Sequence, residues 1–292
     1  MHTRHSKNSR HPRVMLIFSM AVFGTLGVFT RNIQVSSGEL ALYRAILAAG
    51  LILVYLLVTR QPVPFSSIKK EIPFLLASGV AMGINWILLF EAYRYTTISV
   101  ATLSYYFAPV IVTAVCPFLF HERLTKKQLF CFIMSTLGLF MIIGAGYGAG
   151  EGKDLPGIFC GLGAAVFYAA VILLNKFIKN VTGIPRTLLQ FFAAILVLIP
   201  YVALTGGTHL NALSNWGLIC LLIVGLVHTG ITYCLYFSAL KDLPGQETAI
   251  LSYIDPLTAA LVSVTLLGES MTPLQVMGGA FILGFTLWNE KE

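Results

Sequence analysis

The feature that most constrains this chain of 292 residues is a succession of ten apolar runs, each near the length that crosses a lipid bilayer. A transmembrane helix requires about 20 predominantly apolar residues. The runs lie near residues 14–30, 38–58, 73–93, 98–120, 128–147, 157–175, 186–204, 214–238, 247–267 and 273–289. Short connections with Gly, Pro, Asn or charge join them. The sequence therefore predicts an all-α integral membrane protein with ten transmembrane helices.

Composition and charge indicate which partners, lipid or nucleic acid, the chain is expected to have. Hydrophobic residues make up 57% of the sequence and charged residues only 11%, whereas soluble domains carry about 25% charged residues. The net charge of +7 is spread over short loops, and a nucleic-acid binder masses such residues on one face or arm. The five cysteines lie in apolar runs without a CxxC pair, so we expect no metal site. The lipid bilayer is the expected partner, and nucleic acid is not.

The distribution of Lys and Arg predicts the orientation. Residues 1–13 form a basic tail that leads directly into the first apolar run, without a cleavage site. If this tail is cytoplasmic, 15 of the 19 Lys and Arg residues lie in cytoplasmic segments, and only Arg31, Arg94 and Lys153 lie outside. Because cytoplasmic loops are enriched in Lys and Arg, we expect both termini in the cytoplasm. The short loops favour a bacterial-type inner membrane, with a topologically equivalent organelle membrane as the alternative.

An internal repeat appears when the chain is shifted against itself by 147 residues. The matched pairs are Tyr106 with Tyr253, Pro109 with Pro256, Glu122 with Glu269, Thr125 with Thr272, Gln128 with Gln275, Gly83 with Gly230, Trp86 with Tyr233, Ala92 with Ala239 and Arg94 with Lys241. Nine pairs at a single offset indicate duplication. We expect a first repeat at 14–147, an extracytoplasmic linker at 148–156 and a second repeat at 157–289.

Five helices in each repeat imply inversion, because an odd number of spans places the second copy in the opposite orientation. The connection after the fourth run reads HERLTKK and is basic, whereas its equivalent after the ninth reads GESMTPL and has no Lys or Arg. Inverted repeats are typical of secondary transporters that bind substrate near the bilayer midplane and expose it to either side in turn.

The paired segments HERLT and GESMT, each after a Pro-containing helix, and the sequence FGTLGVFTR in the first run resemble the EamA family of the drug/metabolite transporter superfamily. The resemblance covers almost the whole chain. It implies a helical carrier without nucleotide or other cofactor, with a central cavity lined mainly by spans one, three, four, six, eight and nine. Family members carry various metabolites, so the substrate stays open. We favour export of amino acids or related metabolites, with an organic-cation carrier as the alternative, and a monomer as the oligomeric state.

Asp255 is the most informative single residue, because it lies near mid-membrane, immediately before Pro256. A carboxylate at that depth is costly and usually faces a cavity or a partner. Pro256 frees the carbonyl group of Ser252, which favours local unwinding. Burial favours a neutral carboxyl group, so Asp255 is a candidate for proton coupling. The alternative is a structural carboxylate satisfied by a neighbouring helix.

Aromatic and polar residues on the third, fourth, eighth and ninth runs are the candidate substrate contacts. They are Asn85, Trp86, Tyr105, Tyr106, Thr232, Tyr233 and Tyr253. Thr229, Thr232, Tyr233 and Tyr236 follow the i, i+3, i+4, i+7 spacing of one helical face. Such rings suit an organic solute bound by stacking and a few hydrogen bonds, although ordinary interhelical packing explains any single ring equally well.

Three further charged or titratable residues within the apolar runs, Arg44, Glu91 and His228, are candidates for a charge or coupling role. Arg44 could bind a substrate carboxylate, but we favour an ion pair with Glu39 or Glu91, since a buried charge is expensive without a partner. Glu91 is therefore also a candidate charged residue of the site, as an alternative ion-pair partner of Arg44. His228 could relay protons, and a hydrogen-bonded packing role explains it as well.

Other motifs are assigned to folding. Thr125 with Gln128 and Thr272 with Gln275 form predicted capping boxes, and the Glu before each is expected to bond its own turn.

Two other functional classes were weighed. An intramembrane enzyme is disfavoured because the sequence has neither H-E-x-x-H nor G-x-S-x-G, nor an evident second acid beside Asp255. A channel fits a duplicated chain with one buried carboxylate less well than a carrier does.

Overall fold

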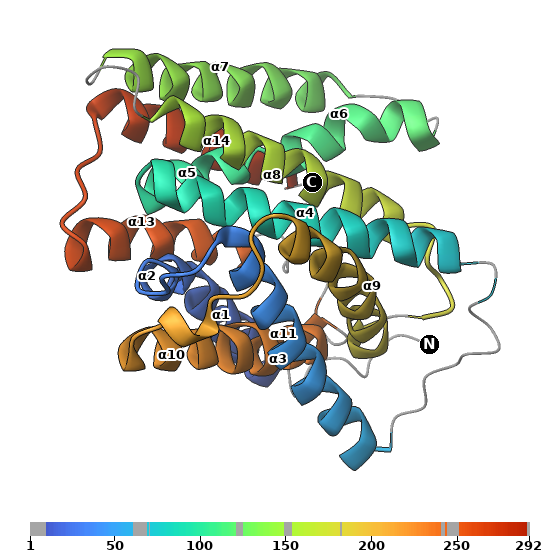
Figure 1. The fold of residues 1–292 in the computed structure, drawn as a ribbon. Coiled ribbons are helices and arrows are strands. Elements are labelled where there is room, and N and C mark those ends of the chain that lie inside the picture. The colour runs from blue at the N-terminus through green and yellow to red at the C-terminus, as the bar shows by residue number, and fades with distance from the viewer. Residues whose placement is uncertain are drawn as a thin grey trace, which may run out of the picture.

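The computed structural model describes residues 10–60, 69, 71–120, 125–148, 154–181, 183–240, 243 and 251–290. These residues are helical and contain no strand (Figure 1). The elements are α1 (Arg10–Gly24), α2 (Leu26–Thr30), α3 (Ser37–Val58), α4 (Ile72–Tyr95), α5 (Ile98–Tyr105), α6 (Ala108–Phe120), α7 (Lys126–Gly148), α8 (Leu155–Asn175), α9 (Gly183–Leu204), η1 (Leu210–Ala212), α10 (Asn215–Leu222), η2 (Ile223–Ile231), α11 (Thr232–Leu240), α13 (Ile254–Leu266) and α14 (Pro273–Glu290).

The predicted all-helical membrane architecture is confirmed, but the predicted number of ten spans is not. Within the described residues, seven helical segments are long and apolar enough to cross a bilayer. They correspond to the first four and the sixth to eighth apolar runs. The helices α7 and α14 fall outside this set, and α13 is apolar but has only 13 residues. Glu122, Lys241 and most of the linker at 148–156 lie outside the described residues.

The fourth and ninth runs are interrupted at equivalent positions of the repeat. The fourth run breaks at Tyr106 and Phe107, between α5 and α6, and the ninth breaks at Tyr253, before α13. Pro109 and Pro256 follow these breaks. Proline has no N–H group and clashes with the carbonyl four residues earlier, so it interrupts the helical hydrogen bonds at that point. The predicted unwinding at Pro256 is present, and Pro109 accompanies the same feature in the first half.

Both predicted capping boxes are confirmed. The backbone N–H of Thr125 donates to Gln128 Oε1 at 2.8 Å, and that of Gln128 donates to Thr125 Oγ1 at 3.2 Å. Thr272 and Gln275 make the same two bonds at the same distances. Each box satisfies N–H groups that a helix start leaves without partners.

Glu269 corrects one sequence prediction, because it binds neighbouring helices as well as its own segment. Its carboxylate accepts a hydrogen bond from the backbone N–H of Ile98 at 2.9 Å and pairs with Arg31, and the Ser263 hydroxyl donates to it. The N–H of Ile98 belongs to the first turn of α5, where acidic groups are favourable. One carboxylate therefore connects the ends of α2, α5 and α13.

Helix contacts are reciprocal between the two halves. A Cβ atom at Gly83 of α4 would lie 3.5 Å from Cγ of Leu198 in α9, and one at Gly230 of η2 would lie 3.2 Å from Cδ2 of Leu51 in α3. Gly83 and Gly230 are 147 residues apart, as are Leu51 and Leu198. The helices α7 and α14 lie side by side (Figure 1), and their backbones meet at Gly138 and Gly278.

The contact at Gly278 predicts a stability difference within α14. A Cβ atom at Gly278 would lie 2.5 Å from the carbonyl oxygen of Gly138, whereas nothing lies within 4 Å of one at Gly284. Gly278→Ala should therefore force the helices apart at a cost of about 1–3 kcal/mol. Gly284→Ala should leave stability unchanged or raise it slightly. Thermal unfolding of the purified variants in one detergent checks this, and equal melting temperatures would contradict the close approach of α7 and α14.

Candidate functional site

Asp255 lies in the first turn of α13, directly after the break at Tyr253, and contacts the break between α5 and α6. The Tyr106 hydroxyl lies 2.8 Å from Asp255 Oδ2 and 3.2 Å from the carbonyl oxygen of Ser252. Ser252 is four residues before Pro256, so its carbonyl cannot accept the usual helical bond from that position. Asp255 keeps part of its surface accessible. The structure thus places one hydroxyl between the carboxyl group of Asp255 and the carbonyl group of Ser252.

Tyrosine rings surround this contact. The centroid of Tyr106 lies 6.0 Å from that of Tyr105 and 6.3 Å from that of Tyr253. Tyr105 also contacts Tyr168 of α8 at 5.1 Å, and Tyr168 is 37% exposed. Three of the predicted substrate contacts are therefore together, beside Asp255.

A second group of rings joins α1, α4, α9 and α11. Tyr233 contacts Phe23 at 5.3 Å and Phe191 at 5.6 Å, and Phe191 contacts Trp86 at 5.3 Å, all edge to face. Edge-to-face geometry aligns the positive edge of one ring with the negative face of another. We call these rings and the tyrosines beside Asp255 the aromatic cluster, which comprises Phe23, Trp86, Tyr105, Tyr106, Tyr168, Phe191, Tyr233 and Tyr253.

Arg44 is buried beside the aromatic cluster, and its predicted ion pair is wrong. The side chain is 3% exposed, and Nε donates to Thr229 Oγ1 at 2.5 Å. The guanidinium carbon lies 4.8 Å from the centroid of Trp86 and 5.5 Å from that of Phe90. No carboxylate within the described part of the chain pairs with it.

The two predicted partners of Arg44 are engaged elsewhere. Glu39 closes a capping box with Ser36 and accepts the backbone N–H of His209 at 2.5 Å. Glu91 pairs with Arg94 one turn later on α4, at 3.1 Å, with both side chains partly exposed. Glu91 therefore lies at the end of α4 in a surface ion pair, apart from the aromatic cluster.

Three other predicted residues make packing contacts. Asn85 donates to the carbonyl oxygen of Ala164 at 2.6 Å, which joins α4 to α8. Thr232 donates to the carbonyl oxygen of Val227 at 2.7 Å. His228 lies 2.9 Å from Thr25 Oγ1 and packs on Phe29 at 5.0 Å. The packing interpretation of His228 agrees with these contacts.

The π-helical segment η2 positions Thr229. Its side chain donates to the carbonyl oxygen of Val224, five residues earlier, at 2.9 Å, and accepts from Arg44. A π-helix widens the turn by one residue and is frequent at functional sites. The spacing in the sequence predicted one face of an α-helix for Thr229, Thr232, Tyr233 and Tyr236. Thr229 instead lies in the π-helical segment, and the other three lie in the α-helix that follows it.

Sequence reasoning missed several members of the site. Tyr168, Phe191, Phe90 and Tyr93 lie in apolar runs with nothing in their local pattern to distinguish them from lipid-facing rings. The repeat offers one signal, because Phe191 stands 147 residues after Arg44.

A cavity of about 840 Å³ opens at the end of the bundle where α2 ends and α3 begins, which we call the far end. Its lining includes Val35 and Ser36 of the connection to α3, His209 after α9, and Phe90 and Tyr93 of α4. Ligand cavities usually measure about 300–1,000 Å³, so an amino-acid-sized solute fits this one.

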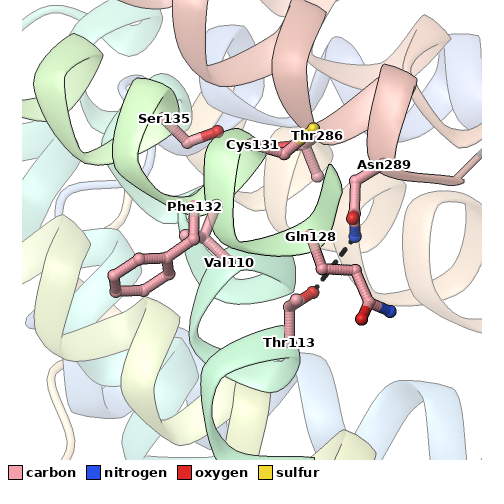
Figure 2. A pocket seen from close by; sticks show the side chains of 8 residues that line it. All are labelled: Val110, Thr113, Gln128, Cys131, Phe132, Ser135, Thr286 and Asn289. Atoms are coloured by element: carbon pink, nitrogen blue, oxygen red, sulfur yellow. Dashed lines mark hydrogen bonds between the residues drawn. The ribbon is translucent and has the colours of Figure 1, made fainter. Parts of the chain in front are cut away.

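A second hollow is too small for a metabolite. It lies between α6, α7 and α14 and has room for about 10 Å³ of water-sized volume, roughly one water molecule. Asn289 donates to Thr113 Oγ1 across it at 3.3 Å, as Figure 2 shows. Ser135 Oγ and Thr286 Oγ1 line it and have no partner among the described residues. These polar groups suit a bound water molecule.

Comparison with known proteins places the chain among transporters. It is 28% identical to the uncharacterized transporter YxxF of Bacillus subtilis, over 94% of this chain and 87% of that protein. It is 28% identical to the threonine/homoserine exporter RhtA of Escherichia coli, over 77% of this chain and 74% of that protein. It is 25% identical to a probable amino-acid metabolite efflux pump of Salmonella typhimurium, over 76% and 78%.

The fold and the family profile agree with these relatives. A solved crystal structure superposes with a TM-score of 0.67 over 94% of this chain and 95% of that one, at 14% sequence identity. The profile of the EamA-like transporter family matches residues 13–144 and again residues 155–289. This protein therefore belongs to the EamA-like transporter family and is a multi-pass membrane transporter.

Proposed function

We propose that this protein is a secondary carrier that exports amino acids or related metabolites by alternating access, coupled to protons through Asp255. The observation that carries the proposal is the contact between Tyr106 and Asp255, made where two helices are interrupted. Backbone breaks at membrane depth are tolerated where protein or a water-lined space surrounds them. Transporters place their binding and coupling groups at such breaks.

The proposed architecture is ten spans in two inverted repeats of five helices. The separate matches of the family profile to the two halves support duplication. So do the equivalent breaks at Tyr106 and Tyr253 and the reciprocal contacts of Gly83 with Leu198 and Gly230 with Leu51. Under this proposal α7, α13 and α14 contribute to the remaining spans.

The contact between Tyr106 and Asp255 suits proton exchange. A tyrosine hydroxyl has one proton to donate, yet its oxygen lies within bonding distance of two oxygens. With Asp255 ionised, that proton turns toward the carboxylate. With Asp255 protonated, the carboxyl group donates to Tyr106, which can donate to the carbonyl oxygen of Ser252. Either state of Asp255 is thus accommodated by rotating one hydroxyl group.

The relatives and the aromatic cluster support the proposed substrate class. Two relatives are named for the export of amino acids or their metabolites. Partly accessible tyrosines beside Asp255 offer stacking and hydroxyl groups to such a solute. The organic-cation alternative rests on Asp255 among tyrosines, but the buried cation of Arg44 beside Trp86 disfavours it.

The proposed orientation has both termini in the cytoplasm of a bacterial cell, with the far-end cavity facing outward. The split of 15 to 3 in Lys and Arg supports it. A monomer suffices for the mechanism, because the aromatic cluster, Asp255 and the cavity all belong to one chain.

Asp255→Asn tests the coupling. The amide keeps the volume and the contact with Tyr106 but cannot exchange a proton. The ratio of L-threonine export rates with and without an inward proton gradient should fall by roughly tenfold, within the usual range of coupling between two binding events. Exchange of labelled for unlabelled L-threonine should persist. Both are measured in preloaded proteoliposomes.

Asp154→Asn is the matched control, because Asp154 lies at the start of α8 and accepts a bond from Thr96 at 2.8 Å. Its coupling ratio should equal that of the wild type. If Asp255→Asn retains the wild-type dependence of export on the proton gradient, Asp255 is not the coupling group.

Orientation is tested by single cysteines in a variant without the five native ones. Asn211 lies in η1 at the far end, and Lys179 lies between α8 and α9 at the opposite end, both exposed. In intact cells a membrane-impermeant maleimide should label Asn211→Cys, and should label Lys179→Cys only after permeabilisation. The reverse pattern would overturn the proposed orientation.

A further inference from the structure

Arg44 carries a charge that the described part of the protein does not neutralise. It is 3% exposed, and a buried charge without a partner is strongly unfavourable. In membrane proteins such charges usually mark a substrate or ion pathway. Among the described residues, its ionisable neighbours are Tyr93, Tyr105, Tyr233 and His228, and none of them is a carboxylate. Arg44 therefore requires an explanation beyond an ion pair.

The neighbours of Arg44 cover the faces of its guanidinium group and accept a hydrogen bond from one N–H. They do not provide acceptors for all of its N–H groups. A guanidinium group has five N–H donors in one plane. Trp86 and Phe90 lie over the group, and Nε binds Thr229. Nη1 has no hydrogen-bond partner among the described residues. The arrangement holds the cation by its faces and leaves the N–H groups of Nη1 to donate to a carboxylate oxygen.

The repeat indicates that packing does not require this cation. The position 147 residues after Arg44 is Phe191, which contacts Tyr233 as Arg44 contacts Trp86. Trp86 and Tyr233 are themselves equivalent in the repeat. An apolar ring thus fills the equivalent place in the second half. Asp255 departs from the repeat in the same way, because its equivalent is Ala108.

The far-end cavity approaches Arg44. Phe90, over whose ring the guanidinium group lies, also lines the cavity. Leu40, four residues before Arg44 on the same face of α3, lines it too. Tyr93 lines the cavity and lies within electrostatic reach of both Arg44 and Asp255. Arg44 thus lies between the cavity and the aromatic cluster.

We propose that Arg44 binds the carboxylate of the transported solute, so that the substrates of this protein are carboxylate-bearing metabolites. The inference rests on the proposed transport function and names the chemical group that the site recognises. Because Asp255 in its ionised state carries the opposite charge near the same tyrosines, a zwitterionic amino acid presents matching groups to both. The rings of Trp86 and Phe90 keep the guanidinium group in place while the carboxylate is absent.

The test compares carboxylates with their neutral amides by thermal shift of the detergent-purified protein. The probes are L-threonine, L-leucine, L-phenylalanine and lactate, each beside its amide. The wild type should bind at least one acid with an apparent Kd about tenfold or more below that of its amide, since an amide offers one acceptor oxygen and no charge. Arg44→Met should lose this preference, and Arg44→Lys should retain only part of it.

Two measurements separate recognition from folding. Without ligand, Arg44→Met should melt at or above the wild-type temperature, because it removes an unpaired buried charge, whereas a structural arginine would leave a variant that melts several degrees lower. Arg94→Met is the matched control, since Arg94 lines the same cavity but pairs with Glu91, and it should keep the preference for the acid.

The proposal is overturned if no acid is preferred over its amide by the wild type, or if Arg44→Met keeps the preference. A preference for lactate alone would retain the carboxylate site and overturn amino acids as the substrates. Loss of the preference in Arg44→Met with unchanged coupling in Asp255→Asn would support the carboxylate site while the proton coupling fails.

Discussion

The hydrogen bond between Tyr106 and Asp255 joins the break between α5 and α6 to the start of α13, directly after the equivalent break at Tyr253. The bilayer core offers no hydrogen-bond partners to backbone N–H and C=O groups, so a break in a helix needs partners from the surrounding protein or from water in a cavity. The Tyr106 hydroxyl lies within bonding distance of the carbonyl oxygen of Ser252 and of Asp255, and its single proton can be donated to either one. The positions of α6 and α13, and the tyrosines around them, depend on this contact.

The far end of the bundle is arranged around a second carboxylate. Glu269 connects Ile98, Arg31 and Ser263, and so joins the end of α2, the start of α5 and the last turns of α13. The cavity opens beside this connection, and Arg31 also belongs to its lining. The two buried charged side chains of Glu269 and Arg44 therefore differ in how they are paired. Glu269 pairs with Arg31 and accepts bonds from Ile98 and Ser263, whereas Nη1 of Arg44 has no hydrogen-bond partner among the described residues.

Much of this arrangement was predictable from the sequence because it rests on periodic or covalent features. The apolar runs predicted the helices, and the prolines predicted where they are interrupted. The 147-residue repeat identified Tyr106 and Tyr253 as equivalent positions. The environment of Arg44 was not predictable. Its partner Thr229 is positioned by a π-helical turn, which no local pattern indicated. Tyr168 and Phe191 were missed because an aromatic residue in an apolar helix has the same pattern whether it faces lipid or protein.

Proton and solute movement recorded together in wild-type proteoliposomes would test coupled transport most directly. Vesicles loaded with L-threonine and a pH-sensitive dye would be diluted into threonine-free buffer without an imposed proton gradient. Because coupling is reciprocal, the outward threonine gradient should drive protons inward and acidify the lumen, and a protonophore should abolish the signal. Threonine efflux without any change in luminal pH would contradict proton-coupled export.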